Sequence, residues 1–270
     1  MSIEFIIKRN GTKEPFNAAK LNGWGEWASN NLENYVDWSE VVLHCYSTNA
    51  KEITSEQLQN SLIDYCLTKA SFAYNRMAGK LFAALLYKQI YGGEPPHTIQ
   101  QVHSNLVEVK LMSPEFYNAY SPEDYAELEK IIDHSRDLNY AHYQIKQIMN
   151  KYSLMNRVEN IYYETPQFVY MRVAMRMCQN KGTGKERINR IKRHYKMYSD
   201  GIVNVPTPYF NNSGTKRSGF LSCNLHSSDD TIGSLTAGDH ISYMMTVGSA
   251  GQGSKIYTRI GIRPPPFSCI

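Results

Sequence analysis

One cysteine stands at the end of a loop rich in small and hydroxylated residues. Cys223 closes the stretch Asn212-Ser-Gly-Thr-Lys-Arg-Ser-Gly-Phe-Leu-Ser-Cys223 and begins an apolar run that is typical of a strand. Glycines and small hydroxylated residues let backbone amides approach a phosphate closely, and a thiol at a strand end can reach into a site. A lone cysteine is more often a buried, inert residue. The loop therefore predicts a candidate site, with inert packing as the alternative.

A second group of residues could bind a polyphosphate. A predicted hairpin with two adjacent cations lies beside a helix start that carries an asparagine and a lysine, and this arrangement offers cations and amide donors to phosphates. A solvated hairpin with ordinary surface charges is the alternative that spacing alone favours. The group consists of Lys8, Arg9, Glu14, Asn17, Lys20, Thr54 and Lys88.

Two further segments carry charges but favour a structural interpretation. His134 lies between Asp133 and Asp137, which could serve acid–base chemistry, yet a packed helix junction with satisfied charges is the favoured reading. The basic segment 187–194 could bind nucleic acid, but no interleaved aromatic residues accompany it. A solvated helix face is therefore the preferred interpretation of that segment.

The first ninety or so residues give strong local signals for the strands and helices that they form. Residues 3–7 predict a strand, an Asn-Gly turn follows, and a short strand resumes at Phe16. Asn17 is a good helix N-cap, and Thr54 begins a second helix with the capping box Thr-Ser-Glu-Gln. A third helix is predicted over 72–90, and the sequence Tyr91-Gly-Gly ends it.

Beyond residue 96 the pattern changes twice. Residues 97–200 are predicted to be helical, with a helix start at Ser121-Pro and an apolar, buried segment over 168–178. After Pro206 the composition shifts to Gly, Ser, Thr and Asn, which predicts short β-like runs. The tail from Arg263 has no helical or strand pattern.

Composition limits the class of protein. The 270 residues are 42% apolar with a mean hydropathy of −0.47, and no apolar run approaches a membrane span. The charged N-terminus indicates neither a signal nor a transit peptide. Five cysteines without a CxxC pair argue against a disulfide scaffold or a zinc site and favour a reducing cytoplasm. The eight histidines form no ligand pattern, so no metal is expected, and the net charge of +4 is weak evidence for nucleic acid.

The N-terminal pattern resembles a known module. Lys-Arg-x-Gly-x-x-Glu-x-x-Asn-x-x-Lys over residues 8–20, followed by the Thr54 helix and the Ala-rich helix that ends at Tyr91-Gly, is similar to the ATP-cone. That module is the regulatory nucleotide-binding domain at the N-terminus of many ribonucleotide reductases. The resemblance implies an ATP/dATP activity site formed by Lys8, Arg9, Glu14, Asn17, Lys20, Thr54 and Lys88.

The rest of the chain resembles the large subunit of class I, phage-type ribonucleoside-diphosphate reductases. Residues 132–168 are similar to its helical scaffold, and the segments Pro206-Thr-Pro208 and 221–225 to its first barrel strand. The resemblance implies that Cys223 is one of two cysteines that reduce the sugar, because a dithiol can deliver two electrons by closing to a disulfide. The implied substrate contacts are Thr207, Ser222, Cys223 and Gly251, and the implied allosteric specificity site is Asp230, Thr231 and Ile232.

The implied fold is mainly α, with an α+β ATP-cone at 1–93, a helical domain at 94–201, the first strands of an incomplete α/β barrel at 202–260 and an unrelated tail at 261–270. The glycine loop 249–254 departs from the family at Gln252, where an apolar residue is usual. The family's thiyl-radical motif Asn-x-Cys-x-Glu, its second reducing cysteine and its shuttle cysteines have no counterpart here. We therefore expect a second polypeptide to complete the enzyme and this chain alone to be inactive.

The resemblance also implies the partners. They are the completing chain, a metal-containing small subunit that generates the radical, a second large subunit and thioredoxin or glutaredoxin, with no membrane and no direct nucleic acid. No covalently bound cofactor is expected, and ATP and dATP are the effectors. One alternative is a non-catalytic nucleotide-sensing regulator built on an ATP-cone, which usually carries zinc-ribbon CxxC pairs. Another is an anaerobic or cobalamin-dependent reductase, which the motif order over 132–168 disfavours.

Overall fold

The computed structural model describes residues 3–46, 50–92, 97–217, 219–248 and 250–256. Its first elements follow from a tight turn and a helix cap. Strands β1 (Phe5–Ile7) and β2 (Lys13–Pro15) pair antiparallel across a turn in which Gly11 has φ +80°, a conformation that favours glycine. The side chain of Asn17 then accepts hydrogen bonds from the amides of Ala19 and Lys20 and begins α1 (Ala18–Ser29). The predicted hairpin and N-cap are thus confirmed.

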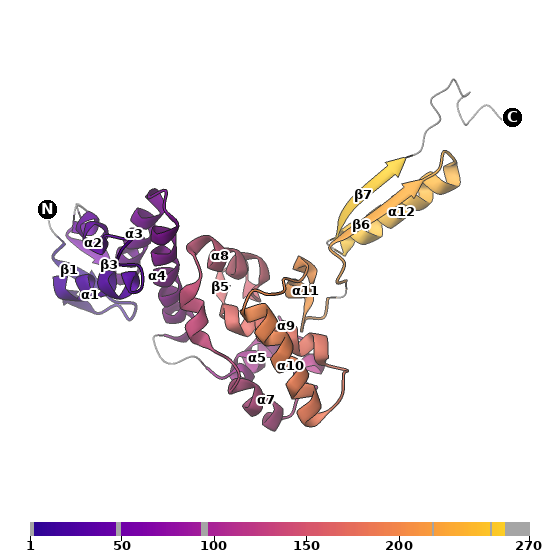
Figure 1. Cartoon of the computed structure of the whole chain (residues 1–270), viewed down its shortest axis with the longest axis horizontal. Coiled ribbons are helices and arrows are strands. Elements are labelled where there is room, and N and C mark those ends of the chain that lie inside the picture. Colours follow the sequence, from indigo (N-terminus) through magenta and orange to yellow (C-terminus); the bar gives the residue numbers. More distant parts are fainter. Residues whose placement is uncertain (1–2, 47–49, 93–96, 218, 249, 257–270) are drawn as a thin grey trace, which may run out of the picture.

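Three more helices complete the N-terminal unit. Strand β3 (Glu52–Thr54) pairs parallel with β1 and leads directly into α3 (Ser55–Thr68), which the predicted Thr54 capping box begins. Helix α4 (Phe72–Tyr91) ends at Gly92 in the left-handed conformation, as the sequence predicts. Helix α2 (Trp38–Tyr46) and strand β3 were not predicted. Figure 1 shows the small sheet and its helices at one end of the molecule.

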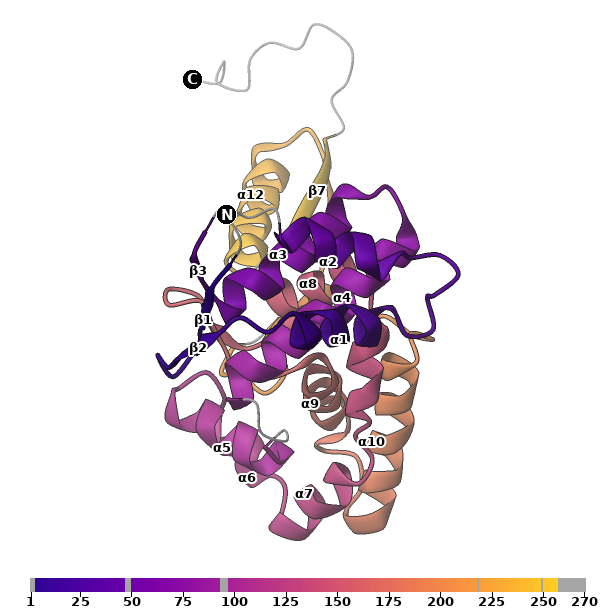
Figure 2. The same cartoon turned by 90° about the vertical axis from the view of Figure 1, so that its left-hand side faces the viewer.

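The middle of the chain is a helical body built around α9 (Pro166–Cys178), whose apolar residues are buried as predicted. Short helices surround it, as Figure 2 shows. Two features depart from the predicted helical pattern, a hairpin of β4 (Met155–Asn156) and β5 (Ile161–Tyr162) and a π-helical turn η2 (Ile148–Tyr152). The other elements are α5 (Ile99–Glu108), α6 (Pro114–Asn118), α7 (Pro122–Glu129), the 3₁₀ helix η1 (His134–Asn139), α8 (His142–Gln147) and α10 (Gly184–Ser199).

A fully buried ion pair ties α9 to its neighbours. The Arg172 guanidinium donates two hydrogen bonds to the Glu164 carboxylate, with Nε–Oε2 at 3.0 Å and Nη2–Oε1 at 2.8 Å. Its remaining N–H groups donate to the backbone carbonyls of Tyr152, Phe210 and Ser213. Both charged side chains are 0% exposed. Arg172 therefore fastens the residues that precede the loop leading to Cys223.

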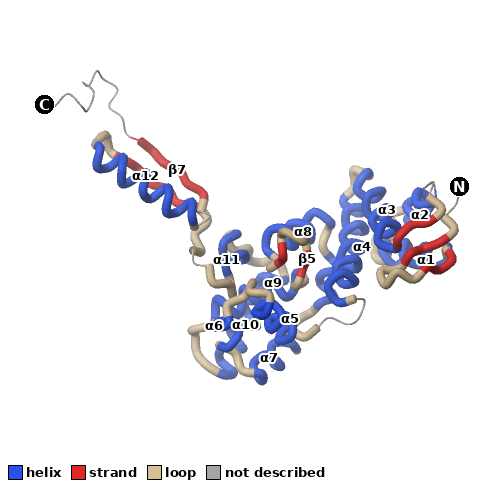
Figure 3. The backbone as a smooth tube through the Cα atoms, turned by 180° about the vertical axis from the view of Figure 1, so that it is seen from behind, coloured by secondary structure: helices blue, strands red, loops and turns tan. Residues whose placement is uncertain are grey.

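The segment after residue 206 corrects the predicted β-like pattern. Thr207–Asn212 is a helix, α11, because Pro206 and Pro208 fit the first turn of a helix and not a ladder of hydrogen bonds. Cys223–Ser228 is a strand, β6, as predicted, and it pairs parallel with β7 (Gly251–Ile256) through the connecting helix α12 (Ile232–Val247). This β–α–β unit projects from the helical body (Figures 1 and 3). The described residues form no closed barrel, and β6 and β7 make a sheet of two strands.

The N-terminal unit and the helical body share a hydrophobic core. Ile145 and Met149, which follow η1, belong to the cluster formed by α1–α4. At the same contact the buried carboxylate of Asp137 accepts a hydrogen bond from the Tyr87 hydroxyl at 2.8 Å and one from the Gln167 amide at 3.0 Å. Within the described residues no cation pairs with Asp137. Burial raises the pKa of Asp137 to about 7, and the two hydrogen bonds oppose this shift.

We expect Asp137→Asn to stabilise the protein above neutral pH. The native carboxyl keeps its proton to a higher pH than the unfolded one, so its contribution to stability is present below about pH 4 and is lost as the pH rises through about 7. The variant should therefore come closest to the wild type near pH 4 and exceed its unfolding free energy near pH 8 by about 1–3 kcal/mol. Urea unfolding at both pH values measures this difference, and an equal effect at both would contradict it.

Within the described ranges, no helix is both long and apolar enough to cross a membrane.

Candidate functional site

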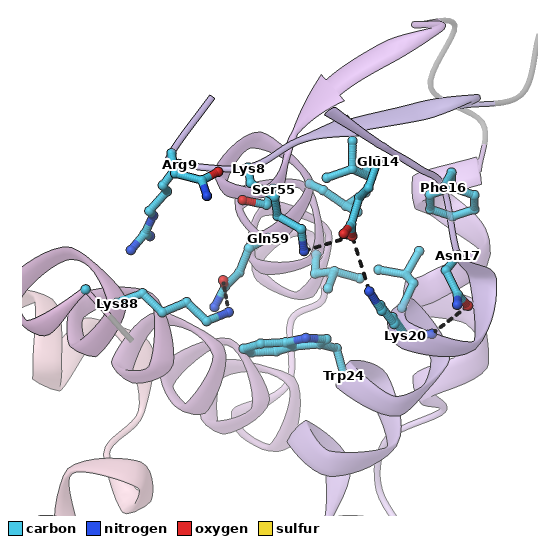
Figure 4. Close-up of a pocket in the computed structure, with 16 residues that line it drawn as sticks. Lys8, Arg9, Glu14, Phe16, Asn17, Lys20, Trp24, Ser55, Gln59 and Lys88 are labelled. Atoms are coloured by element: carbon cyan, nitrogen blue, oxygen red, sulfur yellow. Dashed lines mark hydrogen bonds and ion pairs between the residues drawn. The ribbon is translucent and has the colours of Figure 1, made fainter. Parts of the chain in front are cut away.

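A cavity of about 480 Å³ opens between the β1–β2 hairpin and helices α1, α3 and α4. Figure 4 shows cationic side chains from the hairpin and from α1 and α4 converging on it. Its lining combines apolar side chains with polar ones, and most of its charged side chains are basic. The lining residues are Ile6, Lys8, Arg9, Asn10, Glu14, Phe16, Asn17, Lys20, Leu21, Trp24, Ser55, Leu58, Gln59, Leu62, Lys88 and Gly92.

Glu14 organises two of the cations. Its Oε1 atom lies 2.9 Å from Lys8 Nζ and 3.3 Å from Lys20 Nζ, so one carboxylate holds a lysine from the hairpin and one from α1. The hydrogen bond from Lys8 and the weaker contribution of Lys20 lower the pKa of Glu14. Because the side chains of both ion pairs are partly exposed, the pairs contribute little to stability and are easily rearranged. An incoming anion can therefore recruit either lysine.

Lys88 is the cation that lacks a carboxylate partner. Its Nζ lies 3.6 Å from the centre of the Trp24 ring and 3.2 Å from Gln59 Oε1, and no ion pair with it is formed in the described parts of the chain. Burial, followed by the nearby charges of Arg9 and Lys8, lowers the pKa of Lys88 to about 8. The ammonium is thus mostly charged at neutral pH, yet only an aromatic face and an amide oxygen neutralise it. A phosphate oxygen would supply the negative charge that the Lys88 ammonium lacks.

The rest of the cavity suits a flat apolar group. Phe16, Leu21, Leu58 and Leu62 form its apolar lining beside the indole of Trp24. An aromatic ring can stack on an indole face and be covered by aliphatic side chains, while its polar edge faces Asn17 or Glu14. The cavity thus combines a region for a ring with four basic side chains for phosphates. This arrangement suits a nucleotide, and none of the described lining residues is a cysteine or a histidine.

A second group of residues meets on the β6–β7 pair. Cys223 lies opposite Gly251, and a side chain at Gly251 would place its Cβ 3.5 Å from Cys223 Sγ. Ser222 Oγ is 3.8 Å from the same sulfur, and the Gly251 amide donates to the Ser222 carbonyl at 2.7 Å. Cys223 is exposed, and the absence of a side chain at residue 251 leaves its thiol accessible. Three of the predicted substrate contacts are therefore neighbours.

Two family models match separate parts of this chain. Residues 4–91 match the ATP cone domain, and residues 138–218 match the domain described as "Ribonucleotide reductase, all-alpha domain". The chain carries an ATP cone and the all-alpha domain of ribonucleotide reductase. The cavity bounded by the hairpin, α1, α3 and α4 is thus a cavity of the cone.

Curated relatives that align with most of this chain are named as ribonucleoside-diphosphate reductase alpha subunits. The ribonucleoside-diphosphate reductase subunit alpha of Buchnera aphidicola subsp. Schizaphis graminum is 31% identical over 237 residues, and that of Enterobacteria phage T4 is 26% identical over 238. The ribonucleoside-diphosphate reductase 1 subunit alpha of Escherichia coli is 27% identical over 235 residues. These alignments cover 86–87% of this chain but only 31% of each relative. The chain therefore spans about a third of the length of these relatives.

The cone brings together nearly all residues predicted for the ATP/dATP site. Lys8, Arg9, Glu14, Asn17, Lys20 and Lys88 all line the cavity. Thr54 does not line it, because its side chain is used to cap α3, and Ser55 takes its place at the rim. Their role in nucleotide binding stays a prediction.

Sequence reasoning missed Trp24 and Gln59. Trp24 lies on α1, and no helical spacing relates it to Lys88, which is far away in the chain. Gln59 follows the Thr54 cap by just over one helical turn, so it lies near the start of α3, close to the cap. That spacing is the one local signal that could have identified it.

The remaining predicted residues are spread over separate elements. Thr207 lies in the first turn of α11 and is exposed. Thr231 caps α12 by accepting a hydrogen bond from the Ser234 amide at 3.2 Å, with Asp230 before it and Ile232 as the first helical residue. Ile232 is 52% exposed. This segment therefore begins a helix, with Thr231 as its N-cap.

Lys88 gives nucleotide binding by the cone an expected pH dependence. Phosphates attract the protonated ammonium, and the pKa of Lys88 in the empty cavity is lowered to about 8. Affinity for ATP should therefore fall as the pH rises from about 7.5 to about 9, by up to about tenfold, since one pKa unit corresponds to a tenfold change. Titration calorimetry across this range measures the change. Lys88→Gln should bind more weakly and show a flat profile, and an unchanged slope in that variant would refute the assignment.

Proposed function

We propose that this chain is the N-terminal component of a class I ribonucleoside-diphosphate reductase large subunit, with its cone as an ATP/dATP activity site. The enzyme would convert ribonucleoside diphosphates to deoxyribonucleoside diphosphates for DNA synthesis. One observation carries the proposal: basic side chains from the hairpin, α1 and α4 converge on a cavity that also offers an apolar surface for a base. The names of the relatives support the same reductase family.

Cys223 would supply one half of a reducing pair. Two thiols that close to a disulfide deliver two electrons and two protons, so the ribose gains hydrogen at C2′ and its 2′-hydroxyl leaves as water. The accessible thiol, the adjacent Ser222 and the bare backbone at Gly251 support a substrate that approaches the end of β6. Thr207, Ser222 and Gly251 would contact the substrate, and Asp230, Thr231 and Ile232 would contact an effector deoxynucleotide.

The other parts of the enzyme would come from further protein. We propose a second chain that carries the second reducing cysteine and the thiyl-radical cysteine, together with a radical-generating small subunit, a second large subunit and thioredoxin or glutaredoxin. Support comes from the β6–α12–β7 unit, where Leu225 is 83% exposed and Val247 is 85% exposed. Large apolar side chains at this exposure favour a covering partner. Reduction of a ribonucleoside diphosphate by this chain alone would contradict the two-chain arrangement.

Titration of the chain with ATP and with dATP tests the cone directly. We expect saturable binding of one or both nucleotides, and a loss of at least about tenfold in affinity for Lys8→Gln, because a charge-assisted hydrogen bond is worth about 1.5–3 kcal/mol. Lys192→Gln is the matched control, since this exposed lysine lies on α10, far from the cavity in sequence and fold. Absence of heat with both nucleotides would remove the nucleotide-site assignment.

A further inference from the structure

A second cavity, of about 470 Å³, lies in the helical body and has no role in the function proposed above. Three separate segments enclose it: the turn that follows α5, the segment that runs from η2 into the β4–β5 hairpin, and the loop that follows α11. Its lining residues come from positions 109–111, 152–163 and 211–217. The cavity is therefore comparable in size to the one in the cone, but it is built from entirely different elements.

The lining carries positive charge without compensation. Lys110, Arg157, Lys216 and Arg217 contribute to it, and no aspartate or glutamate is among the described lining residues. None of these four cations takes part in an ion pair within the described chain. Four like charges around one cavity repel one another, so an anion that enters it gains favourable interactions with all of them.

Two acidic residues close in sequence to the lining, Glu164 and Glu159, do not line the cavity. Glu164 is buried behind the hairpin, and its charge is balanced by Arg172. Glu159, in the hairpin turn, accepts a hydrogen bond from the Asn156 amide at 2.8 Å and does not line the cavity. The positive potential of the lining is therefore not cancelled from behind.

The backbone holds the cations in place. Arg157 donates from Nη1 to the Asn150 carbonyl at 2.8 Å, which leaves its other N–H groups available. Lys110 has φ +62°, a conformation that costs a non-glycine residue free energy, and the amides on either side of the turn fix it by bonding to α5. The Thr215 hydroxyl accepts from the Arg217 amide at 3.1 Å and shapes the loop. The positive φ of Lys110 thus belongs to the turn that ends α5 and places this lysine at the edge of the cavity.

The remaining lining residues indicate which class of ligand the cavity could bind. Tyr152 and Tyr163 add aromatic surface with hydroxyl groups, and Leu111 adds an apolar wall. The Tyr152 ring already stacks on Phe210, with centroids 4.5 Å apart, so it is a fixed part of the wall. Multiply charged phosphates are the small anions that several Lys and Arg side chains bind best. We propose that this cavity is a binding site for a polyphosphate-bearing small molecule, independent of the nucleotide site in the cone.

The test uses the full chain with the cone site silenced by Lys8→Gln and Lys88→Gln. Titration calorimetry with inorganic tripolyphosphate and with ATP, at low and at physiological salt, separates the phosphate chain from the nucleotide as the recognised group. We expect saturable binding of tripolyphosphate by the silenced chain. Tighter binding of ATP would indicate that the aromatic wall also contacts a base, and equal or weaker binding would assign recognition to the phosphates alone.

Two paired variants then locate the site. Adding Arg157→Gln and Lys216→Gln should weaken tripolyphosphate at least tenfold, whereas adding the matched pair Arg193→Gln and Lys192→Gln on α10 should change it less than twofold. Lys216 is exposed, so the single variant Lys216→Gln keeps the test valid if the double variant loses helical circular dichroism. The proposal is overturned if the silenced chain binds neither probe at millimolar concentration, or if both pairs weaken binding equally.

Discussion

Replacing Arg172 with methionine is expected to lower the unfolding free energy by about 3–5 kcal/mol, because one partner of a buried ion pair is removed. At 0% exposure, the Glu164 carboxylate would lose both hydrogen bonds from Arg172 and keep the one from the Leu154 amide, and the carbonyls of Phe210 and Ser213 would lose their donor. Methionine is chosen because it fills most of the volume, which leaves the lost interactions as the dominant change. Urea unfolding followed by circular dichroism measures the effect.

Two comparisons make this expectation specific. Arg190→Met removes the same side-chain type from an exposed pair with Glu186 and should cost less than about 1 kcal/mol. The double variant Arg172→Met, Glu164→Gln should be less destabilised than the sum of its single variants, since the second change removes the charge that the first left unpaired. A loss for Arg172→Met as small as that for Arg190→Met would show that the buried pair contributes nothing.

The same ion pair connects stability to the reductase chemistry proposed for Cys223. Arg172 holds the backbone at Phe210 and Ser213, where the loop to Ser222 begins. Glycines and short side chains give that loop little packing of its own. The position of the candidate thiol therefore depends on a charged group in the helical body. A variant of Arg172 that still folds should alter the accessibility of the Cys223 thiol to alkylation.

The cone could be predicted from sequence because its signals are local. The Asn-Gly turn, the Asn17 cap, the Thr54 capping box and the glycine after Tyr91 each act within one turn of chain, and all four are present in the fold. Strand β3 escaped prediction because it is three residues long and gains its stability from pairing with β1, far away in sequence. Helix α2 is short, and the local signal at its start, the Asp37 side chain that accepts hydrogen bonds from the amides of Ser39 and Glu40, was not used in the prediction.

The candidate sites were predictable only in part for the same reason. A family pattern supplied the cations of the cone, but the contact of Lys88 with Trp24 joins α4 to α1 and leaves no mark in local spacing. Beyond residue 206, Gly, Ser and Thr have low helix propensity, so composition favoured β-like runs. Helix α12 forms there nonetheless, with Thr231 as its cap and with Gly238 as its one buried residue among those described. It has no apolar stripe that a periodicity argument could detect.

Gly79→Ala is expected to destabilise the protein by about 3 kcal/mol, although alanine is the better helix former. Gly79 lies in α4 where the cone meets the helical body, and an added Cβ would be 2.1 Å from the Tyr140 carbonyl oxygen and 2.8 Å from the His142 amide nitrogen. These are backbone atoms, which cannot rotate away as a side chain can. The helices must therefore separate, and overpacking of this kind costs about 1–3 kcal/mol or more.

Gly23→Ala provides a control of opposite sign. Gly23 lies inside α1, and an added Cβ would meet nothing within 4 Å, so only the helix propensity changes. That variant should be stabilised by up to about 1 kcal/mol. Because Ile145 and Met149 of the body pack into the core of the cone, Gly79→Ala should lower the stability of both parts in one cooperative transition. A separate, early transition of the cone alone would show that the shared core does not couple them, and equal stability of the two glycine variants would refute the predicted clash.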